Sequence, residues 1–459
     1  MIFRHQKEVM KMEPISRRKF VRTAGTAAAA VAAIRTGKAA GQSPNETINV
    51  AVVGIKSRGW QHIQNFCKIP NVVVKTLCDP DENLFAERVE DVEKLAGMRP
   101  GTASDIRRVL DDKEIDAISI ANQNHWHSLA AIWACQAGKD VYLEKPISHN
   151  IWEGRKVVEA ARKYERIVQT GTQRRSEPYV KSAVDYLHSG ALGRIYMVRL
   201  LVFRPRESIG RGKIEPIPPG IDYDLWLGPA PWRPFIANRF HYNWHWFWDT
   251  GNGETGNNGP HRTDIARWAL QKYEHPRKIQ SLGGIYGWTD SDQETPNTQV
   301  STMEYSDGTL VQLEVRNLYT NGEAGIGVGM LFYGTKGWMR VGGGKWETFF
   351  GREDEPGPSM TGKEAEEALR DTLNTRGTDD EPHFFNFVDA VRAHDRKILN
   401  ADVLEGHLST SMCHLCNIAY RTGRTLVFDS ESETFIGDEE ANRLVRRDYR
   451  YPFVVPEEV

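Results

Sequence analysis

The sequence has few cysteines and no excess of charge of either sign. Five cysteines in 459 residues are an odd number in a long chain, so a disulfide framework is excluded. Lysine and arginine total 59, and aspartate and glutamate total 61. This balance leaves no net field that would attract nucleic acid or an anionic membrane, and we expect neither as a partner.

A long hydrophobic run is also missing from the N-terminal segment. The stretch from Val21 to Ile34 is interrupted by charged and small polar residues and falls short of the roughly 20 apolar residues that cross a bilayer. The preceding "SRRKFVR" resembles a twin-arginine export signal, with Arg17 and Arg18 as the pair and Phe20 after it. Residues 1–46 are therefore predicted to be a signal and linker, and the alternative is a basic, frayed alanine helix.

Such a signal has consequences for the rest of the chain. It predicts a periplasmic or otherwise exported protein with the twin-arginine export machinery as a partner. That route carries proteins already folded, usually around a cofactor loaded in the cytoplasm. We therefore expect a tightly held cofactor.

The length favours two domains, because a single core stops growing below this size. From residue 47, buried strand patterns such as "INVAVVG" and "IDAISIA" alternate with helical patterns. This alternation predicts an α/β domain with a Rossmann-type doubly wound parallel sheet over residues 47–174. Longer alternating runs and an Asp307-Gly308 turn follow. They predict a C-terminal α+β domain over 175–459, with a large, mostly antiparallel open sheet.

The full three-glycine dinucleotide fingerprint is absent, but part of it remains. In "VVGIKSRGW", Gly54 and Gly59 flank the first turn, and Ser57 and Arg58 stand where the next helix starts. Glycine there lets backbone N–H groups approach a pyrophosphate. Asp79 lies 25 positions after the first glycine, where a carboxylate accepts from an adenosine ribose and repels a 2′-phosphate, which favours NAD over NADP. Plain tight turns are the alternative at both places.

Tryptophan is abundant and cysteine pairs are few. Thirteen tryptophans include the cluster in "NWHWFWD", which favours a pocket that stacks flat surfaces such as sugar rings; core packing is the alternative. Cys413 and Cys416 lie in a helical pattern, and no second pair completes a zinc site. We predict a packed core helix there and no metal centre.

The segment "IDAISIANQNHWHSLAAIWACQAGKDVYLEKPIS" resembles the family of glucose-fructose oxidoreductase, inositol dehydrogenase and rhizopine-catabolism proteins (Gfo/Idh/MocA). The resemblance extends from about Ile48 to Asp429, and "YGTKGWMRV" also fits the family's second domain. It implies a Rossmann domain that binds a nicotinamide cofactor. It also implies an α/β domain whose open sheet carries the substrate pocket and the interface of a homo-oligomer.

The resemblance assigns Glu144, Lys145 and Pro146 to the family's "EKP" tripeptide. It implies that Lys145 lies beside both the nicotinamide ribose and the substrate hydroxyl. The physical argument agrees, because a lysine at the carboxyl end of a parallel strand faces the cofactor crevice, where burial lowers its pKa. A surface lysine in a turn is the alternative.

Four further residues are assigned to the cofactor site. The resemblance places Asn122, Asn124 and His127 in the loop on the nicotinamide side, although the usual Thr-Pro is replaced by Asn122 and Gln123. Gln173 is the last residue of "IVQTGTQ", the last predicted strand of the first domain. A structural role for the histidines of "NHWH" is the open alternative.

The segment "GNGETGNNGPHRTDIARWAL" predicts a helix that starts at Pro260. His261 then lies in the first turn, where the helix dipole disfavours protonation and keeps a base available, and it matches the family's catalytic histidine. Asp264, one turn on, is a candidate to orient the ring or to contact substrate. Asn257 stands where the family has an aspartate. Since an amide cannot accept a proton, proton transfer is expected to shift to His261 or Lys145.

An aromatic insertion precedes this helix and supplies candidate substrate contacts at His241, Tyr242, His245 and Asp249. The leading hypothesis is an exported NAD-dependent oxidoreductase that acts on a sugar, polyol or glycoside. One alternative is an NAD-dependent glycoside hydrolase that oxidises, eliminates, hydrates and reduces. The other is a non-catalytic sugar-binding protein stabilised by the cofactor.

Overall fold

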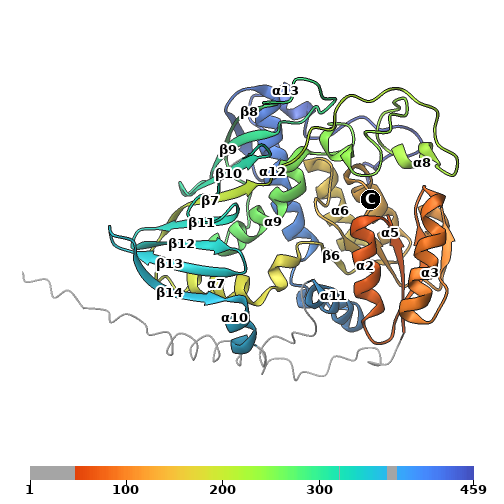
Figure 1. Ribbon diagram of the computed structural model, residues 1–459, viewed down its shortest axis with the longest axis horizontal. Coiled ribbons are helices and arrows are strands. Elements are labelled where there is room, and N and C mark those ends of the chain that lie inside the picture. The colour runs from red at the N-terminus through yellow and green to blue at the C-terminus, as the bar shows by residue number, and fades with distance from the viewer. Residues whose placement is uncertain (1–46, 320, 370–379) are drawn as a thin grey trace, which may run out of the picture.

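The computed structural model describes residues 47–319, 321–369 and 380–459. The predicted export signal, with Arg17, Arg18 and Phe20, lies outside these residues. Two sheets organise the described chain, and helices fill the space between them (Figure 1). Among the described helices, none has the length and apolar character that a membrane span requires.

The first sheet has six strands in the order β3-β2-β1-β4-β5-β6. All neighbours pair in parallel. The strands are β1 (Ile48–Val53), β2 (Val72–Cys78), β3 (Gly101–Ala103), β4 (Ala117–Ile120), β5 (Asp140–Leu143) and β6 (Val168–Thr170). The order reverses between β1 and β4, and ligands of such sheets bind at the carboxyl ends of the strands at that point. The predicted Rossmann-type sheet is confirmed.

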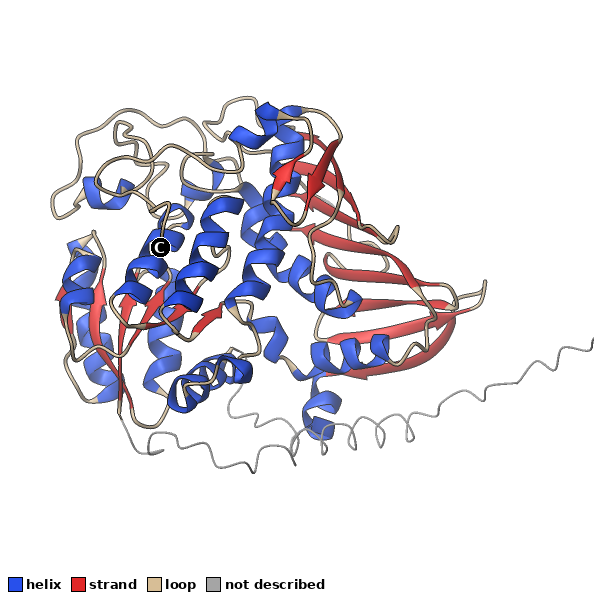
Figure 2. Cartoon of the chain, turned by 180° about the vertical axis from the view of Figure 1, so that it is seen from behind, coloured by secondary structure: helices blue, strands red, loops and turns tan. Residues whose placement is uncertain are grey.

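Helices cover both faces of this sheet, as Figure 2 shows from behind. One face packs against α2 (Ser57–Cys67), α3 (Phe85–Ala96) and α11 (Glu381–Ala393). The other packs against α4 (Ile106–Asp111), α5 (Asn124–Gln136) and α6 (Ile151–Lys163). Gly97 ends α3 with φ 69°, a conformation that glycine adopts without strain.

The second sheet has ten strands in the order β14-β13-β12-β11-β7-β10-β9-β8-β15-β16. These are β7 (Ile195–Phe203), β8 (Lys278–Gly284), β9 (Thr298–Glu304), β10 (Leu310–Arg316), β11 (Val328–Gly334), β12 (Gly337–Gly342), β13 (Lys345–Phe350), β14 (Glu355–Thr361), β15 (Leu426–Asp429) and β16 (Thr434–Phe435). Only β7 and β10 pair in parallel among the neighbours of this sheet. The predicted large, mostly antiparallel sheet is confirmed.

One face of the second sheet is covered by helices, which separate it from the first sheet (Figure 1). They are α7 (Pro178–His188), α9 (Gly253–Leu270), α10 (Gly362–Leu369), α12 (Val403–Thr422) and α13 (Glu439–Arg443). Cys413 and Cys416 are fully buried in α12 and are free thiols, so the prediction of a packed core helix is confirmed. A long segment between β7 and α9 holds the short helices α8 (Tyr223–Leu227) and η4 (Asn243–Trp246).

Two late segments of the chain return to the first sheet. Phe384 of α11 stacks on Tyr142 of β5, with ring centroids 4.4 Å apart. Phe453 and Val455 near the C terminus are buried beside α5 (Figure 1). The predicted boundary at residues 174 and 175 separates the strands of the two sheets, but the first sheet's core also includes side chains from these later segments.

Candidate active site

The turn between β1 and α2 requires glycine at two positions. Gly54 has φ +80°, and a Cβ there would lie 2.6 Å from the backbone nitrogen of Asn122. A Cβ on Gly59 would lie 1.6 Å from the carbonyl oxygen of Gly54. This packing holds the N-terminus of α2, with Ser57 as its first residue, close to the strand ends. The turn therefore has the form that a dinucleotide pyrophosphate needs.

The carboxylate of Asp79 follows β2 on the same edge of the sheet. Its two oxygens accept hydrogen bonds from the backbone N–H groups of Ile55 and Asp81, each at 3.0 Å. Burial raises the pKa of Asp79 to about 6. A small cavity of about 30 Å³ opens nearby, lined in part by Cys78, Pro80 and Asn122. The Oδ1 atom of Asn122 is buried and has no hydrogen-bond partner in the described chain. These acceptors fit the hydroxyl groups of an adenosine ribose.

Arg58 and Glu144, two predicted cofactor residues, bind each other. Glu144 is buried, and its Oε1 accepts from Arg58 Nε at 2.6 Å and from His62 Nε2 at 3.1 Å. Burial acts to raise the pKa of Glu144, but the Arg58 charge and the His62 hydrogen bond hold it well below its usual value. Arg58 also pairs with Asp380 at 2.7 Å. The Glu144 carboxylate thus already has hydrogen-bond and ion-pair partners within the protein. Glu144 acts as a positioning residue for its neighbour in sequence, Lys145.

Gln173 belongs to the same cluster. In the amide orientation that satisfies its hydrogen bonds, it donates to the carbonyl of Gly171 at 2.6 Å and accepts from Arg58 Nη2 at 3.2 Å. Its side chain therefore supports Arg58, and a direct contact with the cofactor remains a prediction.

Lys145 extends from the carboxyl end of β5 to α9. Its Nζ donates to the main-chain carbonyl of Asn257 at 2.6 Å and lies 3.4 Å from the Oδ1 of the same residue. Burial lowers the pKa of Lys145. A lysine that is easily deprotonated at a strand end is suited to move a proton.

The helix that carries Asn257 and His261 begins earlier than predicted. It starts at Gly253, so Pro260 lies inside it and His261 is beyond its first turn. Proline signals a helix start because its ring clashes with the preceding turn, but here the preceding turns are anchored. Glu254 pairs with Arg206 at 3.0 Å, and a Cβ on Gly259 would lie 2.7 Å from Cys413 Sγ of α12. The helix-dipole argument for His261 was wrong.

His261 is nevertheless held neutral, by a different cause. Burial lowers its pKa well below the usual value, and the charges of Lys145 and Arg262 lower it further. Its Nδ1 is buried without a hydrogen-bond partner in the described chain. Asn257 and His261 are four residues apart on one helix and share a face. The structure therefore brings Lys145, Asn257 and His261 together.

Asp264 does not join them. Its carboxylate is fully buried and accepts from Arg175 at 2.7 and 2.9 Å and from Ser409 at 2.9 Å. All these contacts lie within the packing between α9, η3 (Gln173–Ser176) and α12. The expectation that Asp264 orients His261 or touches substrate is not supported, because its acceptors are already used.

The predicted nicotinamide loop forms the first turn of α5. The His127 ring bridges the carbonyls of Pro146 at 2.6 Å and Asn122 at 3.0 Å. Asn124 donates to Asn252 Oδ1 at 3.3 Å. These contacts hold the "EKP" loop and the start of α9 against the first turn of α5. For His127 they match the structural role that the sequence left open as an alternative.

The four candidate substrate residues lie at three different places. His245 is half-buried, stacks on Trp244 with centroids 3.6 Å apart, and has its pKa lowered to about 3 by desolvation, with a smaller effect from Lys145. Tyr242 contacts Arg206 at 3.0 Å through its hydroxyl. His241 instead pairs with Asp81 at 2.7 Å, at the adenosine end. Asp249 pairs with Arg233 and lines a different cavity.

Sequence reasoning missed the cations on the second-domain side. Arg204 and Arg206 follow β7 and reach Asn258 and Glu254 of α9. Arg262 follows His261 directly. The sequence did contain two indications of this face. Two arginines stand in "FRPR", and Glu254, Asn257 and His261 are spaced three or four residues apart, as on one side of a helix.

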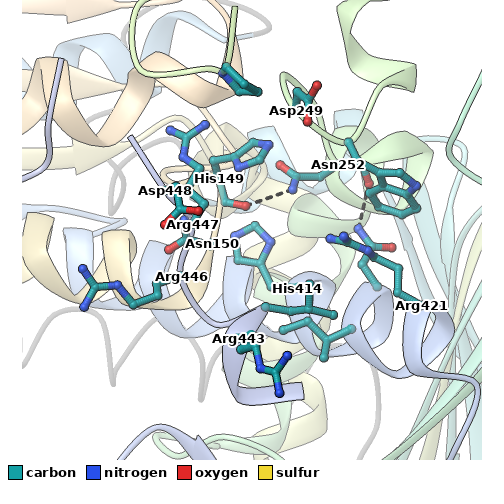
Figure 3. Close-up of a pocket in the computed structure, with 15 residues that line it drawn as sticks. His149, Asn150, Asp249, Asn252, His414, Arg421, Arg443, Arg446, Arg447 and Asp448 are labelled. Atoms are coloured by element: carbon teal, nitrogen blue, oxygen red, sulfur yellow. Dashed lines mark hydrogen bonds between the residues drawn. The ribbon is translucent and has the colours of Figure 1, made fainter. Parts of the chain in front are cut away.

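A larger cavity of about 380 Å³ is lined in part by Trp248 and Asp249 (Figure 3). Arg421, Arg443, His149 and His414 point toward it from α12, from the C-terminal segment and from the loop after the "EKP" tripeptide. It shares no lining residue with the Lys145 and His261 cluster. It is therefore a separate feature.

One buried cluster has the side-chain types of a metal site. His275 and His407 donate from Nε2 to Glu433 Oε1 at 2.7 and 2.6 Å. Arg155 pairs with both oxygens of that carboxylate, at 3.1 and 2.7 Å. Burial lowers the pKa of His407 to about 4, so neutral imidazoles and one guanidinium account for the cluster. The absence of a metal centre stays a prediction.

Two family models match the chain. One, described as "Oxidoreductase family, NAD-binding Rossmann fold", matches residues 48–172. The other, described as "Oxidoreductase family, C-terminal alpha/beta domain", matches residues 208–328 and 367–455.

Two curated relatives match about a third of the chain. A levoglucosan dehydrogenase of Pseudarthrobacter phenanthrenivorans is 29% identical over 157 residues, covering 34% of this chain and 40% of the relative. A glycosyl hydrolase family 109 protein of Shewanella pealeana is 26% identical over 173 residues, covering 33% and 38%. The chain thus spans less than half the length of each.

A solved structure of levoglucosan dehydrogenase in complex with NADH and levoglucosan has the same fold. It aligns with 83% of this chain and 99% of its own length, with a TM-score of 0.62 and 16% identity.

Proposed function

The chain belongs to the Gfo/Idh/MocA family of NAD-binding oxidoreductases, and on that premise we propose that it oxidises a secondary hydroxyl of a sugar, polyol or glycoside. The observation that carries this proposal is the contact of Lys145 with Asn257 across the two domains, one helical turn from His261. It places two groups with lowered pKa values at the carboxyl end of β5. The dinucleotide crevice lies at this edge of the sheet.

The chain's residues supply proton transfer and orientation. When bound, NAD supplies the acceptor for the hydride that leaves the carbon. Neutral Lys145 or His261 accepts the hydroxyl proton as the carbonyl forms, since burial keeps both groups poised for deprotonation. The Asn257 amide orients the hydroxyl and takes no proton. Asp79 accepts from the ribose, and the Gly54 turn admits the pyrophosphate.

The proposal includes export with a tightly bound cofactor. It is supported by Arg17, Arg18 and Phe20 in the sequence and by the contacts that close over the adenosine end. Residues 218–222 pair with the turn after β2, through Glu82 N–H to Gly220 O at 2.8 Å and Asp222 N–H to Pro80 O at 2.9 Å. This segment, residues 218–222, is called the strap, and it slows release of the cofactor. Reoxidation of the bound cofactor then needs a second substrate.

Association into a homo-oligomer is part of the same proposal. The second sheet has helices on one face, and its other face exposes the paired residues Leu282 and Val300, at 66% and 38% of their surface. Apolar side chains on an open sheet favour a protein interface. Light scattering of the purified protein should give a dimer or tetramer mass, and a monomer would contradict this part.

The test is a single-turnover reaction. The protein is purified from the periplasm, its dinucleotide is released by denaturation and identified, and sugars are added to the intact protein. We expect bound NAD and the absorbance of reduced nicotinamide with a subset of sugars. A protein with no dinucleotide, or one inert toward every sugar, polyol and glycoside, would contradict the proposal.

A second candidate is an NAD-dependent glycoside hydrolase. It is favoured by the family 109 relative and by Asn257, which replaces a carboxylate near His261. Oxidation acidifies the neighbouring C–H bond, so a deuterium label there should wash out while the cofactor is regenerated. Retention of the label with net formation of a ketone rules this candidate out.

A further inference from the structure

One face of α9 carries a continuous polar stripe. Its members are spaced at i, i+3, i+4, i+7 and i+8, which places them on one side of a helix. They are Glu254, Asn257, Asn258, His261 and Arg262. Because Asn257 and His261 form the proposed catalytic centre, the whole stripe faces the region where the substrate reacts.

Cations from three other positions reach this stripe. Lys145 contacts Asn257 at 2.6 Å, and Arg204 lies 3.4 Å from Asn258 Oδ1. Arg206 pairs with Glu254 at 3.0 Å. Together with Arg262, four cations meet one carboxylate on this face. Only Arg206 has its charge matched there, so the face carries an excess of positive charge.

Of these four cations, Arg262 carries the charge whose burial destabilises the fold most. Its side chain is only 9% exposed, its Nε is fully buried, and no hydrogen bond or ion pair reaches it from the described part of the chain. Burial, with the nearby charge of Arg174, lowers the pKa of Arg262 to about 10, so it stays charged at neutral pH. Arg174 is itself paired with Glu177 at 2.5 Å. The Glu177 carboxylate also acts on Arg262 and opposes this lowering of its pKa, but it makes no ion pair with Arg262 in the described chain. A buried guanidinium without an ion-pair partner destabilises the fold.

We propose that the substrate is an acidic sugar whose anionic group is bound by Arg262 and Arg204, while its reacting hydroxyl lies against Lys145 and His261. This inference rests on the function proposed above and names the substrate class. Guanidinium groups bind carboxylate, sulfate and phosphate through two parallel N–H donors. The charge of Arg262 acts on His261, so an anion bound by Arg262 lies near the reacting hydroxyl.

The anion that Arg262 binds is neither the pyrophosphate of the cofactor nor a ligand of the large cavity. The pyrophosphate belongs to the Gly54 turn at the N-terminus of α2, in the other domain. The cavity of Figure 3 is lined by other arginines and shares no residue with the stripe.

The test compares sugars that share one ring and differ at carbon 6, where one member of each pair carries an anionic group. The pairs are methyl β-D-glucuronide with methyl β-D-glucoside, D-galacturonate with D-galactose, and the 6-sulfate and 6-phosphate of D-glucose with D-glucose. Reduction of bound NAD is followed in single turnovers. We expect the acidic member of at least one pair to react with the higher kcat/KM, and the pair that does so identifies the anion.

Variants then assign the preference to Arg262. Arg262→Gln should lower kcat/KM for the acidic sugar about 10- to 100-fold more than for its neutral partner, the usual effect of one charged hydrogen bond. Arg262→Lys should recover part of the loss, and Arg204→Gln should lower the same preference. The control is Arg443→Gln, an exposed arginine of the large cavity with no ion pair in the described residues. It removes the same charge and should change neither sugar.

A thermal measurement checks the same claim without catalysis. Removing an unpaired buried charge should raise the melting temperature of the sugar-free protein in Arg262→Gln. The acidic sugar should raise the melting temperature of the wild type and not that of the variant. If Arg262 instead pairs with a partner subunit, the variant melts lower and the inference fails.

Two results separate this inference from the proposed function. If neutral sugars reduce the bound NAD as well as their acidic partners do, the substrate class is wrong and the oxidoreductase function stands. If no sugar of either class reduces it, the proposed function itself is contradicted.

Discussion

The ammonium group of Lys145 donates to the main-chain carbonyl of Asn257 at 2.6 Å, across the junction of the two domains. The contact joins the carboxyl end of β5 to the second turn of α9. It fixes the position of Lys145 relative to His261, which lies one turn further along the same helix. The position of the two candidate proton acceptors relative to each other therefore depends on the relative placement of the two domains.

Removal of either proton acceptor should be more damaging than removal of the amide between them. Lys145→Ala or His261→Ala should lower the rate on the order of 10²- to 10⁴-fold, the usual contribution of a general acid or base. Asn257→Ala should cost only orientation, about 10- to 100-fold. Rapid-mixing measurements of nicotinamide reduction give these rates. Equal losses in all three variants, or loss of bound NAD, would contradict the assigned roles.

The pH profile should respond to the charge at position 257. In the wild type, burial keeps the pKa of His261 well below 6.5, so the ring is an available base throughout neutral pH. Asn257→Asp places a negative charge beside it and raises that pKa. The acid limb of the rate profile should then move to higher pH. An unmoved profile together with an active His261→Ala variant would show that α9 is not at the active site.

NAD affinity should fall in mild acid because of Asp79. The pKa of its carboxyl is raised to about 6 by burial, so the group becomes protonated as the pH falls from 7 to 5. A neutral carboxyl accepts from the ribose less strongly than a carboxylate, by about 1 kcal/mol. The dissociation constant for NAD, measured by calorimetry on the cofactor-free protein, should rise about fivefold.

The matched variant for this test is Asp79→Asn. It should bind NAD weakly at both pH values and remove the pH dependence. A dependence that persists in the variant would assign the titration to another group.

The strap over the adenosine end should control cofactor release. His241 pairs with Asp81 at 2.7 Å and holds the segment between β7 and α9 against the first domain. His241→Ala should accelerate NAD dissociation by about tenfold, since a charge-assisted hydrogen bond of about 1.5 kcal/mol is lost. Ile214→Ala is the control, because Ile214 lies in the same segment and is 72% exposed. Equal release rates in the two variants would show that the strap does not hold the cofactor.

Much of the fold could be predicted because its signals are local. Buried strand runs, the glycine after α3 and the apolar spacing around Cys413 and Cys416 all depend on residues close in sequence. The start of α9 could not be predicted this way. Its glycine-rich first turns are held by Arg206 and by close packing on α12, and these contacts come from distant parts of the chain. Tertiary packing overrode the local signal of Pro260.

The candidate site shows the same division. Lys145, Asn257 and His261 could be named from motifs, and the structure brings them together. Asp264 lies at the same helical spacing, but its carboxylate pairs with Arg175. No local sequence pattern predicts the position of Arg175 on η3. Arg204, Arg206 and Arg262 were missed because a charged residue near a strand end is usually solvated, and only the fold shows that they meet one helix face.

The central claim is that a sugar carbon gives its hydride to the bound dinucleotide while Lys145 and His261 take the hydroxyl proton. It is tested most directly with a sugar deuterated at its secondary carbons, mixed with the intact protein and quenched within one turnover. Mass spectrometry of the released dinucleotide should show one deuterium in the wild type and none in Lys145→Ala. Product formed without deuterium in the dinucleotide would contradict the account.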